Sequence, residues 1–538
     1  MAPRSLGTTA LLFTLAVLTH THPVAAFCGF YVTGADSTLY ANATMVVLMR
    51  DGTRTVLSIQ NNYQGPPEAF ALVVPVPVVL QKENVKVLPK DIFKRIDALG
   101  APRLVEYWEV DPCAPLINQE ATRSGAQPTA ASAGASDAGS VRVEAQFTVG
   151  EYDVVVLSAD DSSALDTWLR ENKYNIPSGA APVLAPYVAS GMKFFVAKVD
   201  PARVTFQGNK AALSPQRLHY DTTEFSLPVR LGLMNSQGSQ DLIVNILAAQ
   251  RYEVANYPNV KVPTNIRVQN DVRNDFASFY EALFSKVLDK TPNAVVTEYA
   301  WDSSSCDPCP TPPLMEQDLL TLGADVLQTR SSGFTLTRLH ARYTKEMLGE
   351  DLVFQQAPAI MGGRDVPGRD GKLPQEVTSS PGFNNFQGRY VILHAWDKPI
   401  ACQEPMRGYW GGPSGTRGST PMTQGSSNGA LTGATPKAGD LPALVAESLP
   451  AIGVTARAPL DPLAAPAAGG GAKATGGSGV EPAADGGTAK PTVEGAPAPN
   501  KSSGCAVAQG RDNGLKLAGL LLAAAALTRR RSSKRGHP

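Results

Sequence analysis

The chain has 538 residues, with 48 basic and 48 acidic side chains, so its formal net charge at pH 7 is zero. Because this balance gives no overall field that would favour nucleic acid, it argues against a DNA- or RNA-binding role. Hydrophobic residues make up 43% of the chain. Long tracts of alanine, glycine and proline dilute this figure, so the folded part is richer in hydrophobic residues than the average suggests.

Residues 1–26 predict a secretory signal peptide, with Arg4 in a basic start, an apolar run at 10–18 and small residues up to Ala26. Cleavage after Ala26 would leave Phe27 as the first residue of the mature chain. A lipoprotein signal needs a small residue before its cysteine, and Phe27 occupies that place before Cys28. The sequence therefore predicts export without lipidation at Cys28.

Residues 27–406 predict a globular α+β domain, mostly antiparallel sheet with several helices, on the basis of apolar periodicity. Strands are expected at 43–49, 53–61, 69–78, 103–110, 141–149, 152–157, 192–199, 294–301, 334–343, 352–355 and 389–394. Residues 225–231, 241–248 and 251–257 suggest an antiparallel meander. Helices are expected at 90–99, 160–174, 182–190, 272–288 and 315–322. A flexible insert is expected at 116–140, and a division into two subdomains near residue 200 is compatible with the pattern.

Residues 407–503 are dominated by Gly, Pro, Ala, Ser and Thr, which predicts a disordered stalk, since such a segment buries too little surface to offset chain entropy. Residues 504–538 then place Cys505 and a polar spacer before an apolar run at 517–527. As a helix this run of about 11 residues spans roughly 17 Å, whereas a bilayer core is about 30 Å thick. It predicts a short membrane-anchor helix or a sorting signal that is later cut.

At these residues the C-terminal segment resembles the MYXO-CTERM sorting signals of myxobacterial surface proteins. The shared features are Cys505, the apolar run and the cluster Arg529, Arg530 and Arg531. The resemblance implies processing near Cys505, contact with the export and sorting machinery, and transfer of the mature protein to the cell surface.

The stretch YDVVVLSADDSSALDTWLRENKYNIPSGAAPVLAPYVASGMKFFVAKVD, together with SLPVRLGLMNSQGSQDLIVNIL, resembles the exported bacterial family known as domain of unknown function 2330. The similarity extends from about Cys28 to Asp397. The family has no assigned activity, fold-based mechanism or catalytic residues, so the resemblance implies an exported location but no reaction.

Five cysteines precede the stalk: Cys28, Cys113, Cys306, Cys309 and Cys402. Export makes disulfides the default state for them, and two bridges would leave one cysteine free. A bridge between Cys28 and Cys402 is attractive because it would join the two ends of the domain. The CxxC pair, Cys306 and Cys309, is followed by prolines rather than a helix, so a structural role is favoured over a redox or metal site.

No other motif carries a convincing reaction. His219, His340 and His394 stand alone and are interpreted as ordinary strand residues. Residues 425–429 match the GxSxG pattern but lie in the predicted stalk, without the strand and helix that a nucleophile elbow requires. Asp365 and Asp370 fit a solvated turn better than a calcium loop. No catalytic residue, metal or cofactor is assigned.

Three hypotheses follow. The favoured one is a surface protein, anchored by its C-terminal segment, whose head binds an unknown ligand or protein or has a structural role. It would lie at the cell surface or outer membrane of a diderm bacterium, or on the inner membrane facing the periplasm. The second is an extracytoplasmic thiol-redox or metal-binding protein that uses Cys306 and Cys309. The third, a secreted hydrolase, has no residues to support it.

Overall fold

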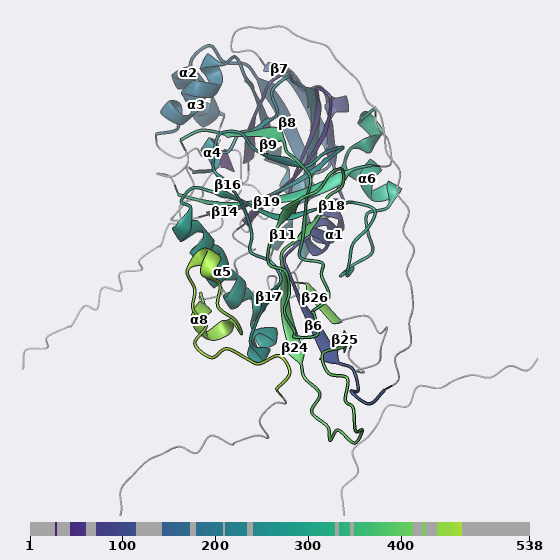
Figure 1. The fold of residues 1–538 in the computed structure, drawn as a ribbon. Helices are drawn as coiled ribbons and strands as arrows, with labels where there is room; N and C mark the ends of the chain where they lie inside the picture. Colours follow the sequence, from purple (N-terminus) through teal and green to yellow (C-terminus); the bar gives the residue numbers. More distant parts are fainter. Residues whose placement is uncertain are drawn as a thin grey trace, which may run out of the picture. The chain divides into compact units, whose positions relative to one another are not determined.

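The computed structural model describes residues 27–28, 43–60, 71–114, 143–172, 179–207, 210–233, 240–328, 333–344, 349–412, 422–425 and 438–464. Two compact units divide the chain, Met1–Gly470 and Gly471–Pro538, and every described residue belongs to the first (Figure 1). The predicted signal peptide up to Ala26, the insert at 116–140 and the C-terminal segment with Cys505 and Arg529–Arg531 lie outside the described residues.

The largest sheet has 11 strands among the described residues, and its centre consists of four long strands in the order β18, β19, β14, β2. Strand β14 runs antiparallel to β19 and parallel to β2. The members are β22 (Thr378–Ser379), β21 (Ile360–Gly362), β23 (Asn385–Gln387), β18 (Val295–Asp302), β19 (Thr335–Tyr343), β14 (Gln240–Ala248), β2 (Ala43–Asp51), β3 (Arg54–Ile59), β12 (Gln216–Asp221) and β5 (Val85–Val87), with β16 (Asn259–Lys261) beside β18.

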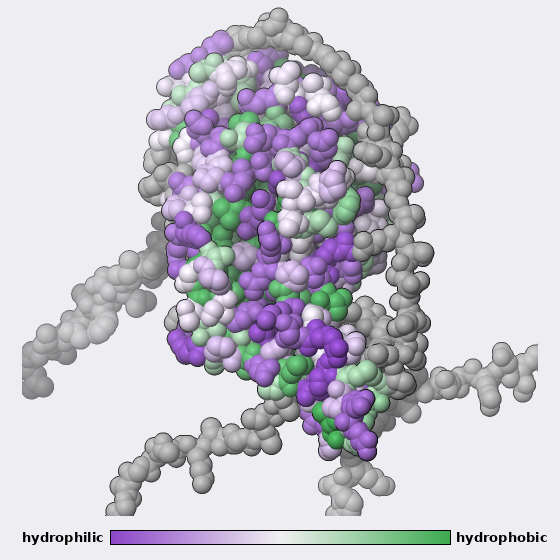
Figure 2. Space-filling model, viewed as in Figure 1, coloured by the Kyte–Doolittle hydropathy of each residue, from purple (hydrophilic) through white to green (hydrophobic). Residues whose placement is uncertain are grey.

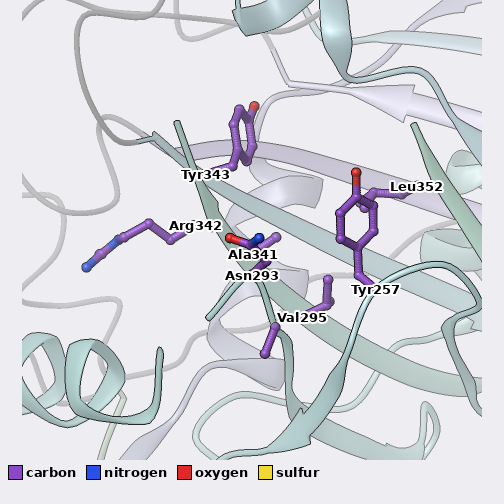
Figure 3. Close-up of a pocket in the computed structure, with 8 residues that line it drawn as sticks. Tyr257, Asn293, Val295, Ala341, Arg342, Tyr343 and Leu352 are labelled. Carbon is purple, nitrogen blue, oxygen red and sulfur yellow. The ribbon is translucent and has the colours of Figure 1, made fainter. Parts of the chain in front are cut away.

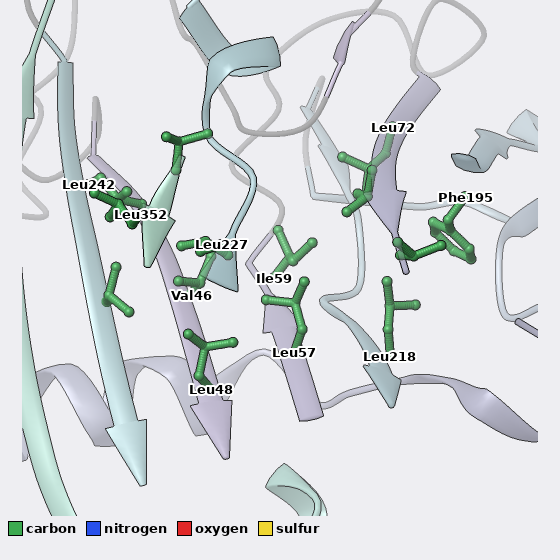
Figure 4. Close-up of a cluster of buried hydrophobic side chains, with 14 of the residues drawn as sticks. Val46, Leu48, Leu57, Ile59, Leu72, Phe195, Leu218, Leu227, Leu242 and Leu352 are labelled. Carbon is green, nitrogen blue, oxygen red and sulfur yellow. The ribbon is translucent and has the colours of Figure 1, made fainter. Parts of the chain in front are cut away.

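A second sheet packs against one face of the large sheet. It consists of β1 (Phe27–Cys28), β4 (Ala71–Val76), β9 (Lys193–Val199), β8 (Tyr152–Leu157) and β7 (Val143–Val149). Since strand side chains alternate between faces, both sheets contribute every second residue to the largest buried cluster. Leu48, Leu57 and Leu218 meet Leu72 and Phe195 there (Figure 4). Helices α2 (Ser162–Glu171) and α3 (Ala180–Ala189) cover the outer face of the second sheet.

Three helices cover the opposite face of the large sheet: α1 (Asp91–Gly100), α5 (Phe276–Lys290) and α6 (Glu316–Leu322). Helix α1 buries Ile92, Phe93, Ile96 and Leu99, the residues whose spacing predicted it. Helix α5 follows the cap residue Asp275, whose carboxylate accepts from Ser278 N, and buries six of its side chains. Beneath α1 and α5, this face of the sheet also carries charged side chains, among them Arg338 and Arg342 of β19.

Two further sheets of three or more strands, and one of two strands, complete the described part of the unit. One has the order β17 (Ile266–Arg267), β24 (Arg389–His394), β6 (Arg103–Glu109) and β25 (Trp410–Gly411), with β26 (Met422–Gly425) also on β6. The other places β13 (Ser226–Leu227) and β15 (Tyr252–Val254) on either side of β20 (Leu352–Gln356). The remaining elements are β10 (Thr205–Gln207), β11 (Lys210–Ala212), α4 (Arg230–Leu233), η2 (Lys82–Asn84), η3 (Pro201–Arg203), η4 (Asn270–Asn274) and η5 (Ala324–Val326).

Residues 438–464, which we call the C-terminal strap, lie within the stalk predicted to begin at 407, and for them the prediction of disorder is wrong. Helix α8 (Leu441–Leu444) and η6 (Pro450–Ile452) pack beside α5, and Val445 and Leu449 join its core (Figure 1). The strap also pairs with the edge of β17, because Gln269 N donates to Leu444 O and Ala446 N to Arg267 O. Its few apolar residues suffice because they are buried in the cluster that also contains the apolar face of α5. Strand β26 likewise lies in the predicted stalk.

The α+β class is confirmed, and the predicted strands and helices outside the meander lie close to their expected places. The meander over 225–257 is wrong, because β14 inserts between β2 and β19 while β13 and β15 both pair with β20. The largest core takes residues from both sides of residue 200, such as Phe195 and Leu218, so no division is seen there in the described residues. Strand β12 was not predicted.

Candidate functional site

Three cationic side chains alternate along one face of strand β19. Arg338, His340 and Arg342 are spaced two residues apart, so all three point toward the helices. The apolar residues between them face the opposite sheet, where Leu339 and Ala341 belong to the largest core. The alternation thus carries charge into the space beneath α1 and α5.

Glu298 meets these cations because strand β18 has an irregularity at that position. Thr297 pairs with Leu339 and Tyr299 with Arg338, so Glu298 is the extra residue of a β-bulge. Its Oε2 accepts from Arg338 Nε at 2.7 Å, and its Oε1 lies 2.6 Å from His340 Nδ1. The hydroxyl of Tyr280 on α5 donates to the same Oε1. The bulge therefore turns a carboxylate toward the charged face of β19.

The chain of contacts continues to the helices and to strand β14. Arg338 Nη1 donates to Asp97 of α1 at 2.7 Å. Arg342 donates from two nitrogens to Asp241 of β14, at 2.8 and 2.9 Å, and from two to Glu281 of α5, at 2.6 and 2.9 Å. We call this set the ionic network: Asp97, Asp241, Glu281, Glu298, Arg338, His340 and Arg342.

Mutual charge sets the protonation of the ionic network. Burial alone would lower the pKa of His340, but the charge of Glu298 and the contact with Asp241 raise it to about 9. Burial would raise the pKa of Glu298, yet the charges of His340 and Arg338 lower it to about 2. His340 Nε2 lies 3.2 Å from Asp241 Oδ1, close enough for an ion pair but not oriented as a hydrogen bond. At neutral pH the histidine is therefore a buried cation between two carboxylates.

Burial limits what the ionic network can do. The side chains of Glu298 and Arg338 are 0% exposed and that of His340 is 1% exposed, with the Phe284 ring stacked on the imidazole at 4.0 Å. A substrate could not reach the imidazole without displacing α5. The geometry instead links α1, α5 and two strands through one set of ion pairs.

A small hollow lies at the end of β18 and β19, beside the ionic network, with a cavity volume of about 20 Å³. Val295, Ala341 and Leu352 give it an apolar lining, and Tyr257 and Arg342 border it (Figure 3). The buried hydroxyl of Tyr343 has no hydrogen-bond partner among the described residues, and burial raises the pKa of this phenol. The hollow has room for about one water molecule, which is too little for a substrate.

Two disulfides are present in the described residues. Cys113 pairs with Cys402 across 289 positions, and Cys306 pairs with Cys309. The pairing, which the sequence left open, is not the Cys28–Cys402 bridge that would join the two ends of the domain, because the ends of β6 and β24 bring Cys113 to Cys402, whereas Cys28 lies in strand β1 beside β4. No group of three or more His, Cys, Asp or Glu side chains suited to a metal occurs in the described part of the chain.

His219, His340 and His394 lie in strands, as predicted, but two of these three have carboxylate partners that the sequence did not reveal. His394 Nε2 lies 2.7 Å from Glu106 Oε2 and stacks on Trp108, and Arg273 pairs with the same carboxylate at 2.8 Å. His340 belongs to the ionic network. The alternation of Arg338, His340 and Arg342 was the available signal, since three cations on one face of a buried strand require buried anions.

The GxSxG match at 425–429 and the candidate calcium residues Asp365 and Asp370 gain no support as sites from the described residues. Strand β26 ends at Gly425, the first residue of the GxSxG match, and the rest of that match lies outside the described residues. Asp370 accepts from Lys372 N in an exposed turn, whereas the Asp365 carboxylate accepts from Asn265.

On the face in Figure 2, hydrophobic residues form small separate areas among hydrophilic ones. The exposed large hydrophobic residues include Met315, Val366 and Phe383, which belong to separate loops. No helix in the described ranges combines the length and the apolar character needed to cross a membrane.

Together these features define a disulfide-bonded α+β protein whose strongest concentration of charge is enclosed and internally paired. The chain belongs to the bacterial family described as "Uncharacterized protein conserved in bacteria (DUF2330)", whose model matches residues 22–355. No curated protein and no solved structure matches the chain. The family match ends at 355, before β24 and the C-terminal strap, so the folded unit extends beyond it.

Proposed function

We propose that this chain is an exported surface protein whose head, residues 27–464, has a binding or structural role rather than a catalytic one. The observation that carries the proposal is the Cys113–Cys402 disulfide. A bond between residues so distant in sequence constrains the unfolded chain strongly and so stabilises the fold. Such a bond persists where thiols are kept oxidised, outside the cytoplasm. Residues 1–26, with the cleavage site after Ala26, supply the matching export signal.

The C-terminal segment supports anchoring in this proposal. Cys505, the apolar run at 517–527 and Arg529–Arg531 have the order of a sorting signal or a short anchor. Residues 465–503 would then be the tether, beginning where the C-terminal strap leaves the head. The protein would lie at the outer surface, or on the inner membrane facing the periplasm.

The ionic network supports a structural role for the charged residues. A general base or nucleophile has to reach a substrate, whereas His340 and Glu298 are enclosed and occupied by their partners. Ion pairs of this kind fix the positions of α1 and α5 on the sheet. Ligand recognition would then fall to the surface of the head.

A thiol-redox role is the second candidate, favoured by one observation. Cys309 of the CxxC disulfide is exposed, so an external thiolate can approach its sulfur. Against an oxidoreductase of the usual kind, α6 begins only at Glu316, so neither cysteine lies at a helix N-terminus that would lower its pKa.

An intact-mass measurement on the protein from fractionated cells tests the proposal. We expect a product that begins at Phe27, ends near Cys505 and is recovered at the outer surface. A product that retains Arg529–Arg531 in the inner membrane would show that the C-terminal segment is a plain membrane anchor and not a sorting signal. Full-length protein in the cytoplasm would refute export. Thiol-disulfide exchange activity in the purified wild type, lost in C306S/C309S, would establish the second candidate.

A further inference from the structure

Two buried arginines lie side by side in the sheet of β17, β24 and β6. Arg103 and Arg389 are register partners on the parallel strands β6 and β24, and both are at most 1% exposed. Neither makes an ion pair with a carboxylate within the described ranges, in contrast to Arg338, which has two such partners. Two guanidinium groups carried by neighbouring strands are thus enclosed without a carboxylate in an ion pair.

This arrangement is unfavourable for the charged forms. Burial lowers the pKa of both arginines. For Arg103, the nearby Tyr299 raises the pKa, whereas the charges of Arg389 and Arg338 lower it further. Asp365 and Asp307 are near enough to offset part of the effect on Arg389. Buried cations normally find a carboxylate or another anion, so a pair without one indicates a place that an anion would fill.

Neutral oxygen atoms cover the pair instead. Arg103 donates to Leu99 O at 2.6 Å and to Pro308 O at 2.8 Å. Arg389 donates to Asn265 Oδ1 at 2.7 and 3.0 Å and to Asp365 O. These acceptors are dipoles, which are weaker partners for a guanidinium group than the bidentate oxygens of a carboxylate or phosphate.

Pro308 belongs to a loop, residues 303–311, that the Cys306–Cys309 disulfide closes; we call it the CxxC loop. The side-chain amide of Gln387 binds this loop: Gln387 Nε2 donates to Asp307 O at 2.6 Å and to Gly363 O at 2.7 Å. Gln387 therefore connects the CxxC loop, whose Pro308 O accepts from Arg103, to the segment around Gly363 and Asp365, whose Asp365 O accepts from Arg389. Cys306 packs against the core, whereas Cys309 is exposed.

We propose that the Cys306–Cys309 disulfide is a redox lock that closes the CxxC loop over an oxyanion site formed by Arg103 and Arg389. In the oxidised protein, Pro308 O of the loop accepts from Arg103, and the loop is held beside the segment of Asp365, whose carbonyl accepts from Arg389. Once the disulfide is reduced, the loop gains conformational freedom and an oxyanion, a phosphate or carboxylate group, replaces Pro308 O.

The reductant is an extracytoplasmic dithiol. One of its thiolates attacks Sγ of the exposed Cys309, forming a mixed disulfide and releasing Cys306 as a thiolate. Its second thiolate then attacks the sulfur of the first, so the reductant becomes a disulfide and Cys309 leaves as a thiolate. Two electrons pass to the protein, and the two protons of the dithiol end on Cys306 and Cys309 through solvent.

The test uses the full wild-type chain and phenylglyoxal, which condenses with accessible guanidinium groups, followed by peptide mass spectrometry. We expect reduction with a small dithiol to raise the modified fraction of Arg103 by about tenfold or more, since local opening then governs access. Inorganic phosphate should suppress that rise, compared with chloride at equal ionic strength. Arg217, buried and paired with Asp325, is the protected reference, and the half-exposed Arg54 is the accessible one.

Two variants separate the disulfides. In C113S/C402S, dithiol can reduce only the CxxC pair, and the rise at Arg103 should persist. In C306S/C309S, Arg103 should be reactive without reductant; if this variant does not fold, the wild-type measurement still decides. An Arg103 that stays protected after reduction would overturn the lock, and a rise that phosphate does not suppress would overturn the oxyanion site. Neither outcome bears on export or anchoring, because the experiment concerns the head alone.

Discussion

Replacing Glu298 with glutamine tests whether the ionic network holds the head together. The substitution keeps the size of the side chain but removes the charge between Arg338 and His340. The amide nitrogen must face either Arg338 Nε or the two donors Tyr280 and His340, so at least one hydrogen bond is lost. Removing one partner from a buried pair costs about 3–5 kcal/mol, because it leaves an uncompensated charge.

The effect should depend on pH in a defined direction. The pKa of His340 is raised from 6.5 to about 9, so its contribution is fully present below pH 6.5 and is lost as the pH rises to about 9. This shift corresponds to roughly 3 kcal/mol. Glu298 has its pKa lowered to about 2, so its own contribution is complete above about pH 4.5 and is lost on acidification. The cost of E298Q should therefore be largest near pH 6 and smaller at pH 10.

Urea unfolding of wild type and E298Q at pH 6 and pH 10 measures the loss of stability and its dependence on pH. The control is D166N, which removes the carboxylate of the Asp166–Arg170 pair on the surface of α2. Such a pair contributes about 0–1 kcal/mol. If E298Q costs no more than D166N, or if its cost is the same at both pH values, the ionic network does not have the role we assign to it.

Three further predictions concern the core, the C-terminal strap and the disulfides. Leu283 of α5 is fully buried, so L283A should lower the free energy of unfolding by about 2–5 kcal/mol in urea titrations; a loss below 1 kcal/mol would contradict its place in the core. Val445 is also fully buried, so V445D should release the strap and make it sensitive to limited proteolysis, whereas unchanged digestion would refute its docking. Loss of the Cys113–Cys402 bond should cost about 6 kcal/mol and loss of the CxxC bond roughly 2 kcal/mol by loop-closure entropy; unfolding midpoints that reverse this order would contradict the pairing.

The sequence pattern predicts part of the ionic network but not all of it. Arg338, His340 and Arg342 stand at alternate positions of a predicted strand, so their common face could be read from the sequence. Their partners could not, because Asp241 lies about a hundred positions earlier and Glu298 points inward only through a bulge. Asp161 is the opposite case: its side chain caps α2 through Ala164 N three residues away, a contact that depends on local sequence alone.

The sequence by itself determined the positions of most strands and helices, the α+β class and the family. These properties depend on periodicity and caps within a dozen residues, where backbone geometry dictates which side chains share a face. Only the tertiary structure decided that β14 lies between β2 and β19, that Cys402 bonds to Cys113, and that the C-terminal strap is folded. An apolar pattern specifies that a face must be buried but not which partner buries it, and a weakly apolar strap becomes ordered only where a complementary groove compensates its lost chain entropy.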